Sequence, residues 1–152
     1  MKSLNWEHPF NKGSSSPKKK SFIETKERVR YSETDQMGVA HNKHYFEWFE
    51  IGRTEFCRKK GISYRDIEKK GYFLVVVESF CRYKKPLRYD EEFLIRVSLR
   101  QASPKKIIFD YKILSIQKKH MAAEGYTVHV ATDQKAKVKP LPPEIFKKIT
   151  PP

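Results

Sequence analysis

The sequence predicts an α+β fold in which an antiparallel sheet wraps around one long helix. One segment of helical period, 42–60, is followed by four segments of strand character and preceded by another. The helix carries a wide aromatic face, and the sheet is the only partner that the pattern offers to cover it. With 152 residues, the chain suits one domain, and an aromatic fraction of 13% is enough for a packed core.

The first predicted strand covers residues 22–31. Apolar residues such as Ile23 and Val29 fall on one side of its alternation, and charged residues fall on the other. Residues 32–38 are polar and end at a glycine, which predicts a loop. The loop therefore leads directly into the long helix.

The long helix is predicted over residues 42–60. Asn42 is a plausible N-cap, and Gly61 is placed where a helix commonly ends. A shorter helix is expected at 64–70, ended by Gly71. One face of the long helix is predicted to be buried, and it consists of Tyr45, Trp48, Phe49, Gly52, Phe56 and Cys57.

Residues 72–83 are rich in Val and Phe, which predicts a central strand buried on both faces. Three later segments also have strand character, and the first of them alternates strictly between apolar and charged residues. Residues 139–143 are rich in proline and end the predicted fold. The later strands are expected at 92–100, 107–116 and 124–132, with a terminal turn at 144–149.

The chain carries a formal net charge of +14, and much of the excess lies near its two ends. Residues 1–20 and 134–152 each hold five lysines against one glutamate. We interpret the first segment as a solubilising tail rather than a polyanion-binding arm. Nucleic acid is not an expected partner, because the aromatic residues fall on periodic core faces. The sequence thus predicts a flexible basic N-terminal tail at 1–21, a domain at 22–143 and a C-terminal tail at 144–152.

Several classes of protein are disfavoured. The longest apolar run, 72–77, is far shorter than the ~20 residues that span a bilayer, and the first ten residues lack a signal-peptide pattern. Cys57 and Cys81 make no disulfide framework, which favours reduced thiols in the cytoplasm. His41 and His44 have no third ligand at a suitable spacing, so no metal and no cofactor is expected.

The loop before the long helix carries the strongest candidate for chemistry, Asp35. The first amides of a helix are unpaired donors with positive dipole character, so they could stabilise charge that develops on a thioester carbonyl oxygen. Asp35 could attack such a thioester or activate a water molecule. By composition alone, however, an aspartate in a polar loop is more often a turn or capping residue.

The spacing of residues around Asp35 resembles the active-site signature of the hot-dog fold acyl-CoA thioesterases. It is most similar to the 4-hydroxybenzoyl-CoA thioesterase and YbgC-like group. The signature consists of Arg28-Val29, Thr34-Asp35, Gly38-Val39, Asn42, Tyr45 and Glu50. The resemblance covers about residues 25–143, with supporting stretches at 77–79, 82–83 and 86–91.

This resemblance implies hydrolysis of an acyl thioester to a free carboxylic acid and CoA, with Asp35 as nucleophile or general base. It implies an oxyanion hole of backbone amides at Val39, Ala40, His41 and Asn42. It also implies a homodimer or homotetramer with acyl pockets between subunits. Several YbgC-like members carry a histidine where this chain has Asn42. The resemblance does not identify the acyl group, and it leaves open whether the thioester is carried by CoA or by acyl-carrier protein.

A non-catalytic hot-dog module that binds or senses acyl-CoA is the alternative, but binding alone needs no carboxylate at Asp35. Glu47 is the reserve catalytic candidate, because another hot-dog branch uses a glutamate on this helix. The alternative interpretation of Glu47 is a residue on the solvated face of the helix that forms an ion pair. Tyr31 and Glu78 are candidates for the pocket lining. The candidates for contact with CoA phosphates, or simply for an exposed charged turn, are Arg82, Lys84, Lys85 and Arg88.

Overall fold

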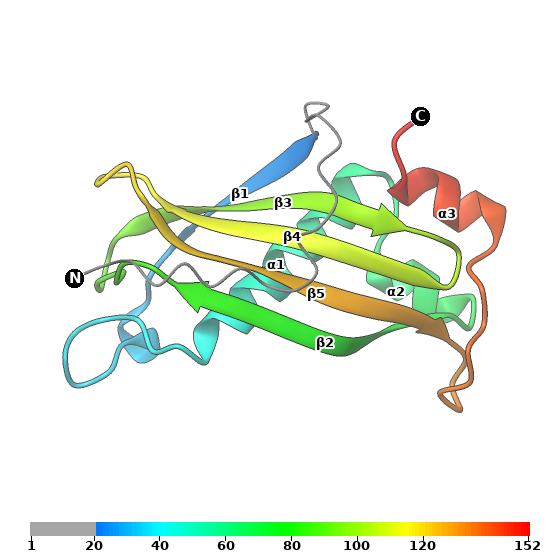
Figure 1. Ribbon diagram of the computed structural model, residues 1–152, viewed down its shortest axis with the longest axis horizontal. Helices are drawn as coiled ribbons and strands as arrows, with labels where there is room; N and C mark the ends of the chain where they lie inside the picture. Colours follow the sequence, from blue (N-terminus) through cyan, green and yellow to red (C-terminus); the bar gives the residue numbers. More distant parts are fainter. Residues whose placement is uncertain (1–20) are drawn as a thin grey trace, which may run out of the picture.

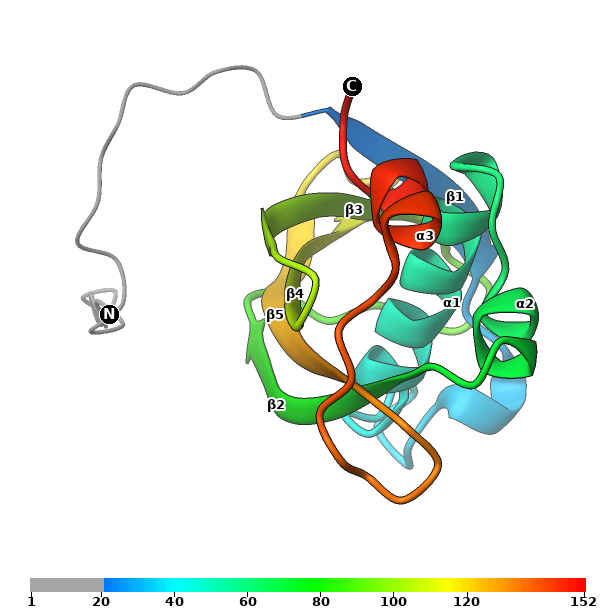
Figure 2. The same ribbon diagram turned by 90° about the vertical axis from the view of Figure 1, so that its right-hand side faces the viewer.

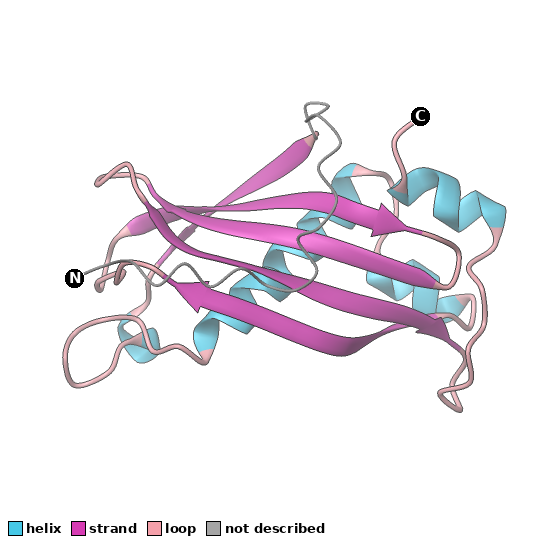
Figure 3. Cartoon of the chain, viewed as in Figure 1, coloured by secondary structure: helices cyan, strands magenta, loops and turns pink. Residues whose placement is uncertain are grey.

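A computed structural model describes residues 21–152 and confirms the predicted α+β architecture (Figure 1). One antiparallel sheet has the strand order β1-β3-β4-β5-β2. The strands are β1 Phe22–Arg28, β2 Phe73–Tyr83, β3 Glu92–Ala102, β4 Lys106–Ser115 and β5 Met121–Thr132. The helices are α1 His44–Lys59, α2 Tyr64–Lys69, α3 Pro143–Ile149 and a short 3-10 turn, η1, Tyr31–Glu33 (Figure 3).

The sheet curves around α1, so that the helix lies inside its concave side (Figure 2). Close packing makes this possible at Gly52, where an added Cβ would lie 2.6 Å from the Ile95 side chain. Phe49 stacks on Tyr111 of β4, with ring centroids 4.2 Å apart. The six residues predicted for the buried face of the helix are the six that are buried. The helix-on-sheet core of the hot-dog fold is therefore confirmed.

The start of α1 differs from the prediction. The helix begins at His44, with Lys43 in the N-cap position, so Asn42 is not the N-cap. The imidazole of His41 takes over part of the capping role, because its Nδ1 accepts a hydrogen bond from the Lys43 amide at 3.2 Å. The predicted end is confirmed, since Gly61 follows the helix with a φ of +86°.

The prediction that β2 is a central strand is wrong, because β2 is an edge of the sheet and pairs only with β5. Its middle is exposed, with 40% of Val75, 42% of Val76 and 57% of Val77 accessible. A run of apolar residues predicts that both faces of a strand are covered. It does not predict whether the strand has a neighbour on each side in the sheet. The central strand is β4.

The C-terminal segment belongs to the core. We expected a tail from residue 144, but this segment forms α3, and Ile145 and Ile149 are completely buried. Prolines at 142 and 143 begin the helix, as fits the first turn. The predicted N-terminal tail lies, except for Ser21, outside the described residues.

The remaining strands follow the predicted alternation. In β3 the side chains of Phe93, Ile95 and Val97 are completely buried, whereas the residues between them are partly exposed. β1 is shorter than expected and ends at Arg28, after which the chain turns into η1. Both cysteines are free thiols. No helix within residues 21–152 has the length and hydropathy needed to cross a membrane.

Candidate active site

Asp35 lies in a tight turn between η1 and α1. Its amide donates to the Val39 carbonyl at 2.9 Å, and the Gly38 amide donates to the Asp35 carbonyl at 3.0 Å. Gly38 has a φ of +76°, which this turn requires and which suits glycine. The Asp35 Oδ1 atom accepts from the amides of Met37 at 2.8 Å and Val39 at 3.4 Å. Among residues 21–152, no donor is hydrogen-bonded to Oδ2, so this oxygen is available to a ligand.

Distant segments of the chain fix this turn in place. Residue pairs Thr34–Ala40 and Val39–Arg88 form isolated antiparallel bridges. The Ala40 amide donates to the Leu87 carbonyl at 2.7 Å. Backbone hydrogen bonds thereby attach the loop that carries Asp35 to the connection between β2 and β3. The position of the carboxylate therefore depends on backbone contacts and not on contacts of flexible side chains.

The backbone amides that were predicted to form an oxyanion hole are not equivalent. The amides of Ala40 and His41 already donate to Leu87 and Glu33 carbonyls, at 2.7 and 2.8 Å, so the prediction is wrong for these two. Val39 donates to Asp35. Only the Asn42 amide among the four has no acceptor within the described part of the chain. The structure therefore leaves Asn42 as the amide that is free to bind a substrate oxygen.

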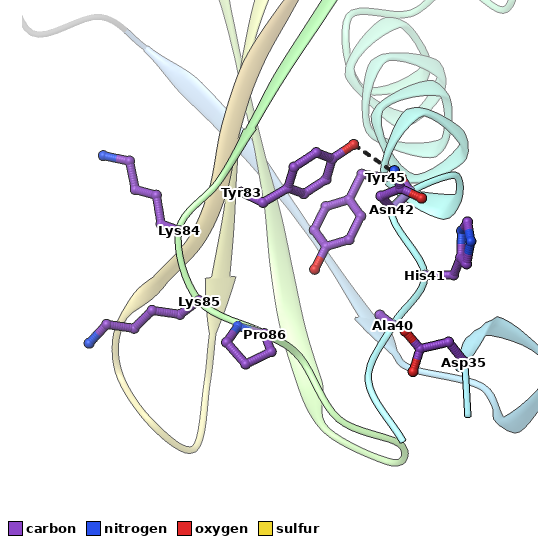
Figure 4. A pocket seen from close by; sticks show the side chains of 9 residues that line it. All are labelled: Asp35, Ala40, His41, Asn42, Tyr45, Tyr83, Lys84, Lys85 and Pro86. Atoms are coloured by element: carbon purple, nitrogen blue, oxygen red, sulfur yellow. Dashed lines mark hydrogen bonds between the residues drawn. The ribbon is translucent and has the colours of Figure 1, made fainter. Parts of the chain in front are cut away.

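Asp35 and Asn42 line a cavity of about 380 Å³ (Figure 4). One wall comes from the segment before α1 and the first turn of α1, and the other comes from the end of β2 and the turn after it. The Tyr83 hydroxyl joins the walls by donating to the Asn42 carbonyl at 3.2 Å. The lining residues are Asp35, Ala40, His41, Asn42, Tyr45, Tyr83, Lys84, Lys85 and Pro86.

Two aromatic rings form the inner part of this cavity. Tyr45 is only 3% exposed and contacts Tyr83 edge-on, with centroids 4.9 Å apart. Burial raises the pKa of Tyr45 well above its usual range, so the phenol stays neutral. The helical period predicts Tyr45 as a core residue, and the structure places this member of the signature around Asp35 in the cavity as well. The sequence predicts Tyr83 as a strand residue but no role in the site, because the helix that faces it is distant in sequence.

Of the four residues predicted to contact CoA phosphates, two line the cavity and two do not. Lys84 and Lys85 line the cavity, and Figure 4 shows their side chains extending away from it. The Lys84 ammonium group is paired with Glu124 at 3.1 Å. Arg82 and Arg88 are not among the lining residues. Any contact of the two lysines with a ligand would thus be at the mouth of the cavity.

The other three candidates do not line the cavity. Tyr31 is 78% exposed and packs edge-on against Tyr89. Glu78 accepts a hydrogen bond of 2.5 Å from the Tyr126 hydroxyl. Glu47 is exposed and lies 3.1 Å from His44 Nδ1. None of these side chains therefore contributes to the cavity that Asp35 lines.

One group of potential metal ligands occurs within residues 21–152. Glu33, His44 and Glu47 each offer a ligand atom, and these atoms lie within 4.8 Å of one another. The spacing of residues in the sequence offers no third ligand beside His41 and His44, whereas the structure brings two carboxylates to His44 and leaves His41 out of the group. Hydrogen bonds account for the arrangement, because Glu33 accepts from the Trp48 indole and the Arg30 amide, both at 2.8 Å.

Proteins of one family resemble this chain. A family model described as the thioesterase-like superfamily matches residues 29–149. A protein of Aquifex aeolicus, provisionally named an esterase, is 32% identical over 119 residues, 78% of this chain and 91% of the relative. An acyl-acyl carrier protein thioesterase of Arabidopsis thaliana is 28% identical over 127 residues, 84% of this chain and 67% of the relative. The structure of a DHNA-CoA thioesterase from Staphylococcus aureus has a TM-score of 0.75 at 30% identity, and covers 78% of this chain and 80% of that one.

Proposed function

The chain belongs to the thioesterase-like superfamily and hydrolyses acyl thioesters, and from this premise we propose that Asp35 drives the reaction. One observation carries the proposal: a carboxylate with a free Oδ2 and a free backbone amide, that of Asn42, line the same cavity. A base or nucleophile beside a fixed donor is the pair that thioester hydrolysis requires.

In the proposed reaction the thioester carbonyl oxygen accepts a hydrogen bond from the Asn42 amide. As a general base, Asp35 takes a proton from water, whose oxygen attacks the carbonyl carbon. The carbon–sulfur bond then breaks, and the thiolate leaves with the proton. As a nucleophile, Oδ2 forms the new bond itself, the thiolate leaves, and water hydrolyses the resulting anhydride. In both routes negative charge develops on the oxygen that faces Asn42.

The test is thiol release from short, long and aromatic acyl-CoAs by wild type and by Asp35→Asn. We expect the variant to lose at least ~100-fold in kcat, the usual contribution of a positioned acid or base. Full activity of Asp35→Asn would refute the role of the carboxylate. Binding of CoA thioesters without turnover by wild type would instead favour a sensor. In a single turnover in ¹⁸O-water, label found in Asp35 identifies the nucleophilic route, because it enters the carboxylate only when water attacks the aspartyl carbonyl of an anhydride.

We propose CoA rather than acyl-carrier protein as the carrier. Lys84 and Lys85 stand at the mouth of the cavity and could bind phosphates there. The Staphylococcus relative is named for a CoA thioester and the Arabidopsis relative for a carrier-protein thioester, so both carriers occur in the family. Reversing the charge of Lys84 and Lys85 should raise KM for acyl-CoA at low salt. An unchanged KM would contradict this assignment.

We also propose a homodimer or homotetramer assembled through β2, in a cytoplasmic setting that suits the two free thiols. The β2 edge exposes Val75, Val76 and Val77, and an unpaired apolar edge readily pairs with a second strand. Light scattering on the eluting protein should give at least twice the chain mass. Val75→Lys should lower that mass, and a wild-type monomer would contradict the proposal.

A further inference from the structure

We propose that the Tyr45 hydroxyl donates a hydrogen bond to the acyl group of the substrate and so selects acyl groups that carry an acceptor. The inference rests on the proposed function, because that function places the thioester next to Asp35. It adds a residue that determines which acyl group is preferred.

The Tyr45 hydroxyl has no hydrogen-bond partner among residues 21–152. Tyr45 as a whole residue is only 3% exposed, and its hydroxyl oxygen is not among the fully enclosed polar atoms without a partner, so this oxygen keeps some accessible surface. Figure 4 shows its oxygen directed into the space between Tyr83, Pro86 and Ala40, which all line the cavity. A phenol that is held in a nearly buried residue, has no acceptor in the protein and is reached from a cavity is placed to donate to a ligand in that cavity.

The surroundings explain why the protein does not supply that acceptor. Tyr45 is held between two aromatic side chains, Trp48 at 4.7 Å and Tyr83 at 4.9 Å between centroids. The indole of Trp48 donates to Glu33, and the Tyr83 hydroxyl donates to the Asn42 carbonyl. Both neighbours thus use their polar atoms in other hydrogen bonds. They fix the position of the Tyr45 ring but offer no acceptor to its hydroxyl group. Burial also keeps this phenol neutral, so it stays a donor at working pH.

The acyl group is the part of the substrate that reaches this hydroxyl. CoA is large and charged, so its phosphates stay in water, and the acyl end is the end that enters the part of the cavity formed by Tyr45 and Tyr83. A cavity of about 380 Å³ has room for a short acyl group, and Tyr45 is its most buried aromatic wall. An oxygen on the acyl chain close to the thioester would therefore accept from Tyr45.

The experiment compares acetoacetyl-CoA, whose 3-oxo group accepts a hydrogen bond, with butyryl-CoA, which lacks that group. We expect the ratio of their kcat/KM values to fall roughly three- to tenfold in Tyr45→Phe, the effect of one lost hydrogen bond between neutral groups. Using a ratio cancels the different intrinsic reactivity of the two thioesters. Tyr64→Phe is the matched control, because Tyr64 carries another buried phenol outside the cavity and should leave the ratio unchanged.

Three results would overturn the inference. An equal loss on both thioesters would mean that Tyr45 contacts the part that they share. An unchanged ratio in a folded Tyr45→Phe variant would mean that the hydroxyl contacts no acyl oxygen. Absence of turnover with wild type on every thioester would overturn the proposed function together with this inference, whereas the first two results leave the role of Asp35 intact.

Discussion

Asp35 and Asp133 adopt the same turn. In each, the aspartate amide donates to the carbonyl four residues later, and one carboxylate oxygen accepts from the amides two and four residues later. The third following residue has a positive φ in both, +76° at Gly38 and +60° at Ala136. Only Asp35 lines the cavity. An experiment can therefore separate the contribution of a turn aspartate to stability from a contribution of Asp35 to the reaction.

Asp35→Ala and Asp133→Ala should cost similar stability, about 1 kcal/mol each, because both remove the same local hydrogen bonds. Only Asp35→Ala should abolish thiol release. Thermal unfolding and kcat on one acyl-CoA measure the two effects. If Asp133→Ala lost activity equally, the loss would follow from the turn and not from chemistry at Asp35.

Replacing residue 42 by its α-hydroxy acid exchanges the backbone N–H for an oxygen and keeps the side chain. We expect kcat to fall about 100-fold with little change in KM, because the Asn42 amide would act mainly on the developing oxyanion. The same exchange at His41 removes the hydrogen bond to Glu33 and should mainly lower stability. A variant at 42 with wild-type kcat would show that the oxyanion is bound elsewhere.

His129 should make folding stability depend on pH. It is completely buried, and burial together with Arg53 lowers its pKa to about 4. The unfolded chain therefore binds a proton between about pH 6.5 and 4 that the folded chain does not, so the free energy of unfolding falls as the pH falls through that range. The full loss is roughly 3 kcal/mol.

Denaturant unfolding at pH 7 and pH 4.5 measures this dependence. His129→Gln removes the titrating group and should flatten the profile. An identical pH profile in wild type and His129→Gln would contradict the assignment.

Gly52→Ala should destabilise the protein by about 1–3 kcal/mol, although alanine favours helices. The new methyl group would meet Ile95 and Val97 side-chain atoms at 2.6 and 2.7 Å. Glu50→Ala, on the exposed side of the same helix, should be close to neutral. Chemical denaturation compares the two variants, and an unchanged stability for Gly52→Ala would mean that α1 can move away from β3.

The sequence predicted the features that depend on neighbouring residues. The buried face of α1 and the alternation in β3 repeat over short distances, and both were confirmed. The edge position of β2 depends on how strands pair across the chain, so an apolar run could not reveal it. Likewise, the amides of Ala40 and His41 are occupied by carbonyls of Leu87 and Glu33, which no local pattern connects to them. The cavity arises from the same long-range pairing.

The bulge in β2 has a consequence for the cavity. Val76 pairs with His129 and Glu78 with Val128, so Val77 is an extra residue that shifts the strand by one position. Side chains alternate strictly along a strand, so this insertion changes the phase of everything after it. Tyr83 faces the helix only because of that shift. If Val77 were paired with Val128 instead of being left out in the bulge, each later residue would move on by one partner, and Arg82 rather than Tyr83 would stand opposite Ala123 and turn toward α1. The bulge in the middle of β2 thus decides that an aromatic ring, and not a charged side chain, forms this wall of the site.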